Sequence, residues 1–170
     1  MQNVLKNTVS FVVLLVRHLR IHWPVYPLVA ACCYFFADNY RIGLNQTASL
    51  PQSVFLIHKN EPAHKGDYLA FRTPAGSRFA HEAILTKIVV GESGDVVSVA
   101  DRIVSVNGHP VGFAKTHSLK GEPLEPISPT VIGPDQVYVM GLHKDSLDSR
   151  YSIVGLVSRS SVVGKAHPIW

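Results

Sequence analysis

Hydrophobic residues follow two patterns along the chain: one long run within the first forty residues, and short β-branched runs after residue 50. The long run, Trp23–Phe36, has no charged residue and approaches the roughly 17 to 25 residues that a membrane-crossing helix needs. Pro24 and Pro27 fall in its first turns, where a missing backbone N–H is least costly. We therefore expect a basic N-terminal segment over residues 1–22 and one transmembrane helix over residues 23–38.

The charges around this run predict its orientation. Lys6, Arg17 and Arg20 precede it, and no acidic residue does. Cations flanking an apolar span remain on the cytoplasmic side. We therefore expect a single-pass membrane protein with a cytoplasmic N-terminus and with everything after Asp38 outside, facing the periplasm or the exterior.

A cleaved signal peptide is the alternative interpretation of the same run. Cys32 and Cys33 lie among small residues of the kind found at cleavage sites, whereas the bulky residues 34–36 that follow are not typical of such a site. Two adjacent cysteines cannot staple an exported domain, so no disulfide framework is expected.

The short runs after residue 50 predict a mainly β domain over residues 39–170. Seven runs are expected to be strands: 53–58, 68–72, 83–90, 96–100, 102–106, 136–141 and 153–157. Asn107-Gly108 follows one of them and is a strong signal for a type I′ hairpin turn. Residues 121–134 contain four prolines and are expected to be a surface loop. The expected fold is a partly open β-barrel or sandwich.

Composition and charge narrow the function. The chain is 46% apolar and has 16 Lys and Arg against 12 Asp and Glu. When the three N-terminal cations are set aside, 13 basic residues remain against the 12 acidic ones, so no basic footprint for nucleic acid is left. His81-Glu82 begins like a zinc-peptidase helix, but the second histidine ligand is absent, because Leu85 stands in its place. Neither nucleic acid nor a metal or other cofactor is expected.

Lys87 is the residue with the most suggestive surroundings. It lies within the apolar stretch 84–90, where burial would disfavour its ammonium form and lower its pKa toward the range of a general base. The alternative is an edge-strand lysine whose ammonium reaches solvent. No Gly-x-Ser-x-Gly nucleophile motif accompanies it.

Four separated segments favour the catalytic interpretation, because together they resemble the type I signal peptidases of the S26 family. These segments are Asn45–Pro51, Lys65–Phe71, Lys87–Val97 and a last box comprising Tyr138–Gly141 and Ser146–Tyr151. They occur in the family's order and cover about residues 45–170. The similarity is greatest to the TraF-type conjugative-transfer branch, which processes pilins. Ser49-Leu50-Pro51 stands where signal peptidases have Ser-Met-x-Pro, as in that branch, and Leu142-His143 replaces the usual polar residue after Gly141.

The resemblance implies a Ser-Lys dyad. The roles it implies are the nucleophile for Ser49, the general base for Lys87, oxyanion-hole donors for the Thr47 hydroxyl and the Ser49 backbone N–H, an orienting hydroxyl for Ser146, and a supporting ion pair for Asp148 and Arg150. Asp148 and Arg150 could equally form a plain surface pair.

The implied activity is cleavage of a membrane-inserted precursor, most specifically a conjugative pro-pilin, with cyclisation through an acyl-enzyme as an extension. A general leader peptidase that removes signal peptides is the first alternative. The second is a non-catalytic membrane-anchored β-module of a pilus or secretion machine. The expected partners are the precursor protein, the lipid bilayer and a conjugation or secretion machine.

Overall fold

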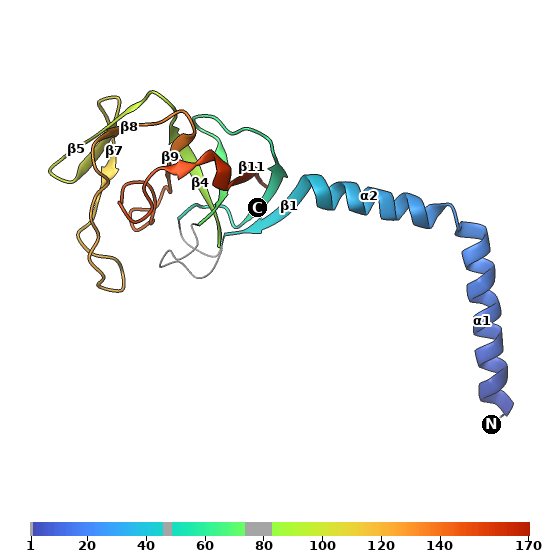
Figure 1. Cartoon of the computed structure of the whole chain (residues 1–170). Helices are drawn as coiled ribbons and strands as arrows, with labels where there is room; N and C mark the ends of the chain where they lie inside the picture. The colour runs from blue at the N-terminus through green and yellow to red at the C-terminus, as the bar shows by residue number, and fades with distance from the viewer. Residues whose placement is uncertain (1, 46–48, 74–82) are drawn as a thin grey trace. The chain divides into compact units, whose positions relative to one another are not determined.

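The computed structural model describes residues 2–45, 49–73 and 83–170, with side chains from residue 10 onward (Figure 1). The chain divides into two compact units, Met1–Asp38 and Asn39–Trp170. The first unit is helical and the second is built from β-strands.

The N-terminal unit contains two helices where the sequence pattern predicted one. Helix α1 covers Gln2–His22 and helix α2 covers Val25–Asn39. The helix breaks at Trp23 and Pro24, because a residue before proline disfavours the α region and proline itself has no N–H to donate. Helix α2 contains all but the first two residues of the predicted span 23–38, but its 15 residues are fewer than the roughly 20 that a span needs. Among the described residues, no helix combines the length and the apolar character required to cross a membrane.

The larger of two sheets holds seven strands, and every described pair in it is antiparallel. In spatial order the strands are β1 (Tyr40–Leu44), β2 (Val54–Lys59), β11 (Val162–Pro168), β3 (Tyr68–Arg72), β4 (Ile84–Gly91), β9 (Gln136–Met140) and β10 (Val157–Ser158). A short 3-10 helix, η1 (Arg159–Ser161), links β10 to β11.

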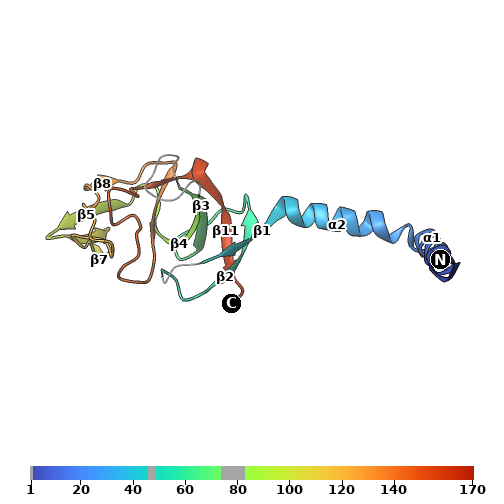
Figure 2. The same cartoon turned by 90° about the horizontal axis from the view of Figure 1, so that it is seen from below.

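Among the described residues, the smaller sheet has four antiparallel strands; it lies beside β9 of the larger one in Figure 1, and Figure 2 shows it from below. In spatial order they are β7 (His109–Phe113), β6 (Ile103–Val106), β5 (Val96–Ala100) and β8 (Thr130–Val131). Asn107 and Gly108 join β6 to β7 with φ of 51° and 78°. Both angles are positive, as a type I′ turn requires, so the predicted hairpin is confirmed.

The mainly β prediction is confirmed, but one predicted strand is wrong. Of residues 153–157 only Val157 enters a strand. Gly155 adopts a positive φ of 61° and its N–H donates to the Tyr151 carbonyl at 2.9 Å, which folds this segment into turns. No predicted run corresponds to β7, although the Asn107-Gly108 turn implied a partner for β6, and none corresponds to β1, β8 or β11. The last of these carries Gly164 and Lys165 in its middle and shows no clear alternation.

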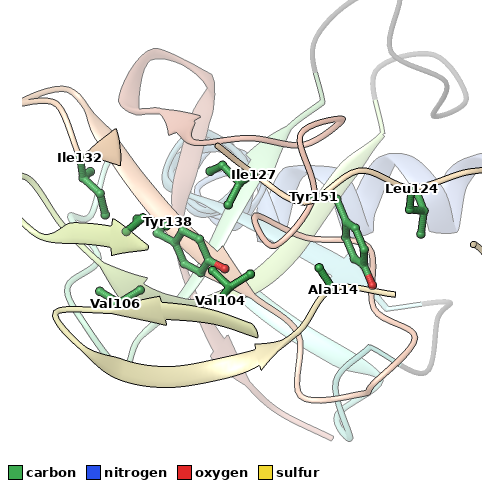
Figure 3. Close-up of a cluster of buried hydrophobic side chains, with 9 residues drawn as sticks. Val104, Val106, Ala114, Leu124, Ile127, Ile132, Tyr138 and Tyr151 are labelled. Atoms are coloured by element: carbon green, nitrogen blue, oxygen red, sulfur yellow. The ribbon is translucent and has the colours of Figure 1, made fainter. Parts of the chain in front are cut away.

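A buried cluster joins the smaller sheet to the segment that contains the last box (Figure 3). Val104 and Val106 come from β6, Tyr138 comes from β9, and Tyr151 is the last residue of the box. All four side chains are at most 5% exposed. Each fully buried Val is worth about 1.5 to 3 kcal/mol of transfer free energy, so this packing fixes where the box lies.

Candidate active site

Lys87 lies in the interior of the larger sheet. Its strand, β4, runs between β3 and β9, with Lys87 opposite Leu69 and with Ile88 opposite Met140. The Lys87 side chain is only 4% exposed. The alternative interpretation as a solvent-reaching edge-strand lysine is therefore wrong.

The surroundings of Lys87 favour its neutral form. Burial lowers the pKa of the ammonium from 10.5 to about 8, with the positive charge of Arg150 acting in the same direction and the negative charge of Asp148 opposing it. Among the described residues, no carboxylate lies within ion-pair distance of its Nζ. Nζ instead donates a hydrogen bond to Ser146 Oγ at 2.8 Å. A substantial fraction of the amine is therefore neutral near pH 8.

Asp148 and Arg150 form a buried ion pair, not a surface one. Arg150 Nε donates to Asp148 Oδ1 at 2.8 Å and an Nη donates to Oδ2 at 2.9 Å. Their side chains are 5% and 0% exposed for Arg150 and Asp148. Each partner also forms a hydrogen bond with the backbone. Asp148 Oδ2 accepts the Gly141 N–H at 2.9 Å, and Arg150 donates to the Ser146 carbonyl at 3.0 Å. The pair thereby supports the residue that contacts Lys87.

Gly141 lies where Ser49 and Ser146 converge. A Cβ on Gly141 would be 2.7 Å from the Ser146 Cβ and 2.9 Å from the Ser49 carbonyl oxygen, so no larger residue fits without a shift. That carbonyl accepts the N–H groups of Leu142 at 2.8 Å and His143 at 3.3 Å. Ser49 is 6% exposed. The structure therefore brings Ser49, Ser146 and Lys87 to one place through the segment that begins at Gly141.

Sequence reasoning overlooked two residues of this site, Gly141 and Ser149. Ser149 Oγ accepts the Val139 N–H at 3.0 Å, and the Ser149 N–H donates to the Val139 carbonyl at 3.0 Å. The second part of the last box, residues 146–151, is thereby held against strand β9. Both residues were within the quoted motifs, but a motif alone does not separate a residue that holds the loop from one that reacts.

The remaining predictions for the site concern the oxyanion-hole donors and the side chains that could bind a metal. Thr47 lies outside the described residues, so its part in an oxyanion hole stays a prediction, as does that of the Ser49 N–H. For metals, the described residues contain no group of three or more His, Cys, Asp or Glu side chains placed to hold an ion. His81 and Glu82 are also outside the described residues.

A comparison with known protein families assigns the chain to the same family that its motifs resemble. The family model described as signal peptidase, peptidase S26, matches residues 15–170. The chain belongs to the S26 signal peptidase family. It is therefore a serine peptidase, and the non-catalytic β-module is set aside.

Two other comparisons complete the picture. No curated protein matches the chain significantly. Among solved structures, the chain is similar to a signal peptidase I from Enterococcus faecalis V583, with 21% identity and a TM-score of 0.38. The match covers 62% of this chain and 97% of that one.

In this S26 peptidase, Asp148→Asn is expected to lower the free energy of unfolding by about 3 kcal/mol, because it leaves the buried Arg150 cation without its counter-charge. It also removes the negative charge that raises the pKa of Lys87, so a pH–rate profile governed by this lysine would have its acidic limb moved below pH 8. Urea unfolding and kinetics test both effects. Glu125→Gln is the matched control, because Glu125 is 76% exposed and its carboxylate lies as far as 3.8 Å from the Arg102 guanidinium, so this pair contributes little to stability. A loss no larger than that of the control contradicts the structural role of the pair.

Gly141→Ala is expected to lower kcat about tenfold or more and stability by about 1 to 3 kcal/mol, because the new methyl group overpacks against Ser146 and the Ser49 carbonyl. The control is Gly133→Ala, whose Cβ would meet only the flexible Gln136 side chain. Steady-state kinetics and thermal unfolding measure the two effects. Wild-type kcat in Gly141→Ala would show that this close approach does not hold the site.

Proposed function

We propose that Ser49 is the nucleophile of this peptidase and Lys87 its general base. The observation that carries the proposal is the buried Lys87 amine, with a pKa of about 8 and a hydrogen bond to Ser146 Oγ. Ser146 orients the amine, and the Asp148–Arg150 pair holds Ser146. The contacts of Gly141 with both serines support a placement of Ser49 beside the amine.

The proposed reaction proceeds through an acyl-enzyme. Neutral Lys87 takes the Ser49 hydroxyl proton while Oγ attacks the scissile carbonyl carbon. The tetrahedral intermediate expels the amine of the departing peptide, which receives that proton from Lys87. Water then attacks the ester with Lys87 again as base, which frees Ser49 and a new carboxyl terminus. Thr47 and the Ser49 N–H are the proposed donors to the oxyanion, where one donor is worth about 2.7 to 4 kcal/mol.

The pH–rate profile of the wild-type enzyme follows from this assignment. Only the neutral amine acts as a base, so kcat/KM is expected to fall about tenfold per pH unit below pH 8 and to level off above it. Initial cleavage rates between pH 6 and 10 test this. A profile that is flat from pH 6 to 8 contradicts a base with this pKa.

We also propose that the N-terminal unit associates with the bacterial inner membrane, with its N-terminus cytoplasmic and the β domain in the periplasm. Apolar side chains are exposed along both helices, including Phe11, Leu28 and Phe35. The only formally charged side chains before Asp38 are cations. Such a surface suits an anionic cytoplasmic leaflet.

For the substrate, we propose a membrane-inserted precursor of a conjugative pilin, which the enzyme cleaves and then closes into a ring. The support is the sequence resemblance to the TraF-type branch, in which Ser49-Leu50-Pro51 is the distinguishing segment. In cyclisation the acyl group of the ester passes to the amino terminus of the same pilin instead of to water, and the Ser49 hydroxyl is released.

Coexpression separates this proposal from a general leader peptidase. The chain is produced with a candidate pro-pilin and, separately, with a secretory precursor that carries an Ala-x-Ala site. Intact mass spectrometry follows the products. Cleavage of the pro-pilin alone supports the pilin assignment, and a product lighter than the linear peptide by one water shows cyclisation. Cleavage of the secretory precursor alone overturns the assignment in favour of leader peptidase activity.

A further inference from the structure

The segment from Gly141 to Leu147 touches both members of the proposed dyad. Its Leu142 and His143 N–H groups hold the carbonyl of Ser49. At its other end, Ser146 Oγ accepts the hydrogen bond from Lys87. A displacement of this segment would therefore alter the nucleophile and the base together.

Asp145, immediately before Ser146, ties the segment to the part of the chain that follows the smaller sheet. Its carboxylate forms an ion pair with the ammonium of Lys115, which lies two residues after β7. The Asp145 side chain is only 14% exposed, whereas that of Lys115 is 36% exposed. The hydrogen bond from the Lys115 ammonium holds the pKa of Asp145 below its usual value, so this carboxylate is ionised throughout the working range of a base with a pKa of about 8.

The backbone of Lys115 is held on both sides. The Arg102 guanidinium donates to the carbonyl of Ala114 at 2.7 Å and to that of Lys115 at 2.8 Å. The Lys115 N–H donates to the hydroxyl of the buried Tyr151 at 3.3 Å. Figure 3 shows this hydroxyl pointing toward Ala114, the neighbour of Lys115. Lys115 is thus a fixed point from which its side chain reaches Asp145.

Packing does not replace the ion pair. A pocket of about 260 Å³ lies beside it and is lined by both partners together with Leu119 and Leu147. Asp145 therefore has open space on one side. Lys115 is its closest cationic partner and comes from outside the segment, whereas His143 Nδ1, 3.8 Å from the carboxylate, belongs to the segment itself. Lys120 lines the same pocket and is exposed, but no described carboxylate lies within ion-pair distance of it.

We propose that Lys115 is a positioning residue of the peptidase, which acts through Asp145 to hold the 141–147 segment against Ser49 and Lys87. This inference rests on the proposed Ser49–Lys87 dyad. It gives the smaller sheet a part in catalysis, since Arg102, between two strands of that sheet, holds the backbone of Lys115, and Lys115 pairs with Asp145 beside the dyad.

The test compares Lys115→Met, Asp145→Asn and the double variant with the wild-type enzyme, and uses Lys120→Met as the matched control. Each single change is expected to lower kcat about threefold to tenfold with KM unchanged, because the pair orients reacting groups and binds no substrate. The double variant is expected to be no slower than either single variant, as partners in one interaction are not additive. Lys115→Arg is expected to restore most of kcat.

Two results overturn the proposal: wild-type kcat in both single variants, or a change confined to KM. If Lys115→Met does not fold, Asp145→Asn and Lys115→Arg decide on the same criteria. Ser49→Ala is measured alongside. Undiminished activity in that variant contradicts the dyad and removes the basis for this inference, whereas a Ser49-dependent enzyme that is indifferent to Lys115 contradicts the positioning role alone.

Discussion

Lys87→Met is expected to abolish cleavage and at the same time to stabilise the fold. Methionine fills a similar volume but accepts no proton, so Ser49 loses its base. Removal of one member of a catalytic unit lowers kcat by about 10⁴-fold or more in serine peptidases. The two opposite effects separate a catalytic lysine from a structural one.

The gain in stability follows from the pKa of Lys87. Its folded value of about 8 lies below the ordinary 10.5, so between these values the unfolded chain binds more protons and stability rises with pH. Below pH 8 the folded protein carries the full penalty of a buried ammonium, which the difference between 10.5 and about 8 places at about 3 kcal/mol. Lys87→Met removes this penalty but leaves Ser146 Oγ without its donor. We therefore expect a net gain of about 2 kcal/mol at pH 7.

Urea unfolding at pH 7 and at pH 10.5 measures this effect. The variant should be clearly more stable than the wild type at pH 7 and no more stable than it at pH 10.5, where the ammonium penalty has almost vanished. Lys144→Met is the matched control, since Lys144 lies exposed in the neighbouring loop and should change neither stability nor activity. A destabilised Lys87→Met that still cleaves its precursor would show that the lysine is structural.

Ser49→Ala is expected to reduce kcat by about 10⁴-fold or more, because no other group supplies the attacking oxygen. The fold should persist, because alanine retains the backbone carbonyl that accepts the N–H groups of Leu142 and His143. Cleavage by purified protein, with circular dichroism to verify the fold, tests this expectation. Ser98→Ala, at an exposed position on β5, is the control. A Ser49→Ala enzyme that retains more than a tenth of wild-type kcat excludes Ser49 as the nucleophile.

The sequence predicted the strands best where β-branched residues follow one another and where the residues of a turn tolerate positive φ. Strand β3 occupies its predicted residues, and the Asn107-Gly108 hairpin forms because only residues that tolerate positive φ suit that turn. Strand β11 was missed because it pairs with β2 and β3, which lie about a hundred residues away. Pairing partners at that distance supply what its own residues do not show. Residues 153–157 have the composition of a strand, yet Gly155 folds them into turns.

The N-terminal unit shows the limit of a hydropathy run. The run Trp23–Phe36 is continuous in composition, but Pro24 separates two helices, and α1 extends back to Gln2. Helix α2 begins two residues after the start of the predicted span 23–38 and ends one residue after its end, so the pattern located this helix closely but did not predict that the preceding residues form α1.

At the site, the motifs in the sequence identified residues that lie close together in the structure. Lys87, Ser146, Asp148 and Arg150 are buried and in contact. Sequence alone could not decide whether Asp148 and Arg150 were buried, because the same spacing suits a surface pair. It also gave no role to Gly141 or Lys115, whose importance lies in what their neighbours in space require.

The central claim is that cleavage passes through an ester on Ser49 formed with Lys87 as base. The most direct measurement is precursor cleavage at pH 9 in the presence of hydroxylamine, with the new carboxyl terminus identified by mass spectrometry. An acyl-enzyme is open to attack by this amine as well as by water, so the account predicts that part of the product is the hydroxamate and that Ser49→Ala yields neither form. A product that is entirely the free acid at every hydroxylamine concentration, or a hydroxamate formed equally well by Ser49→Ala, would contradict it.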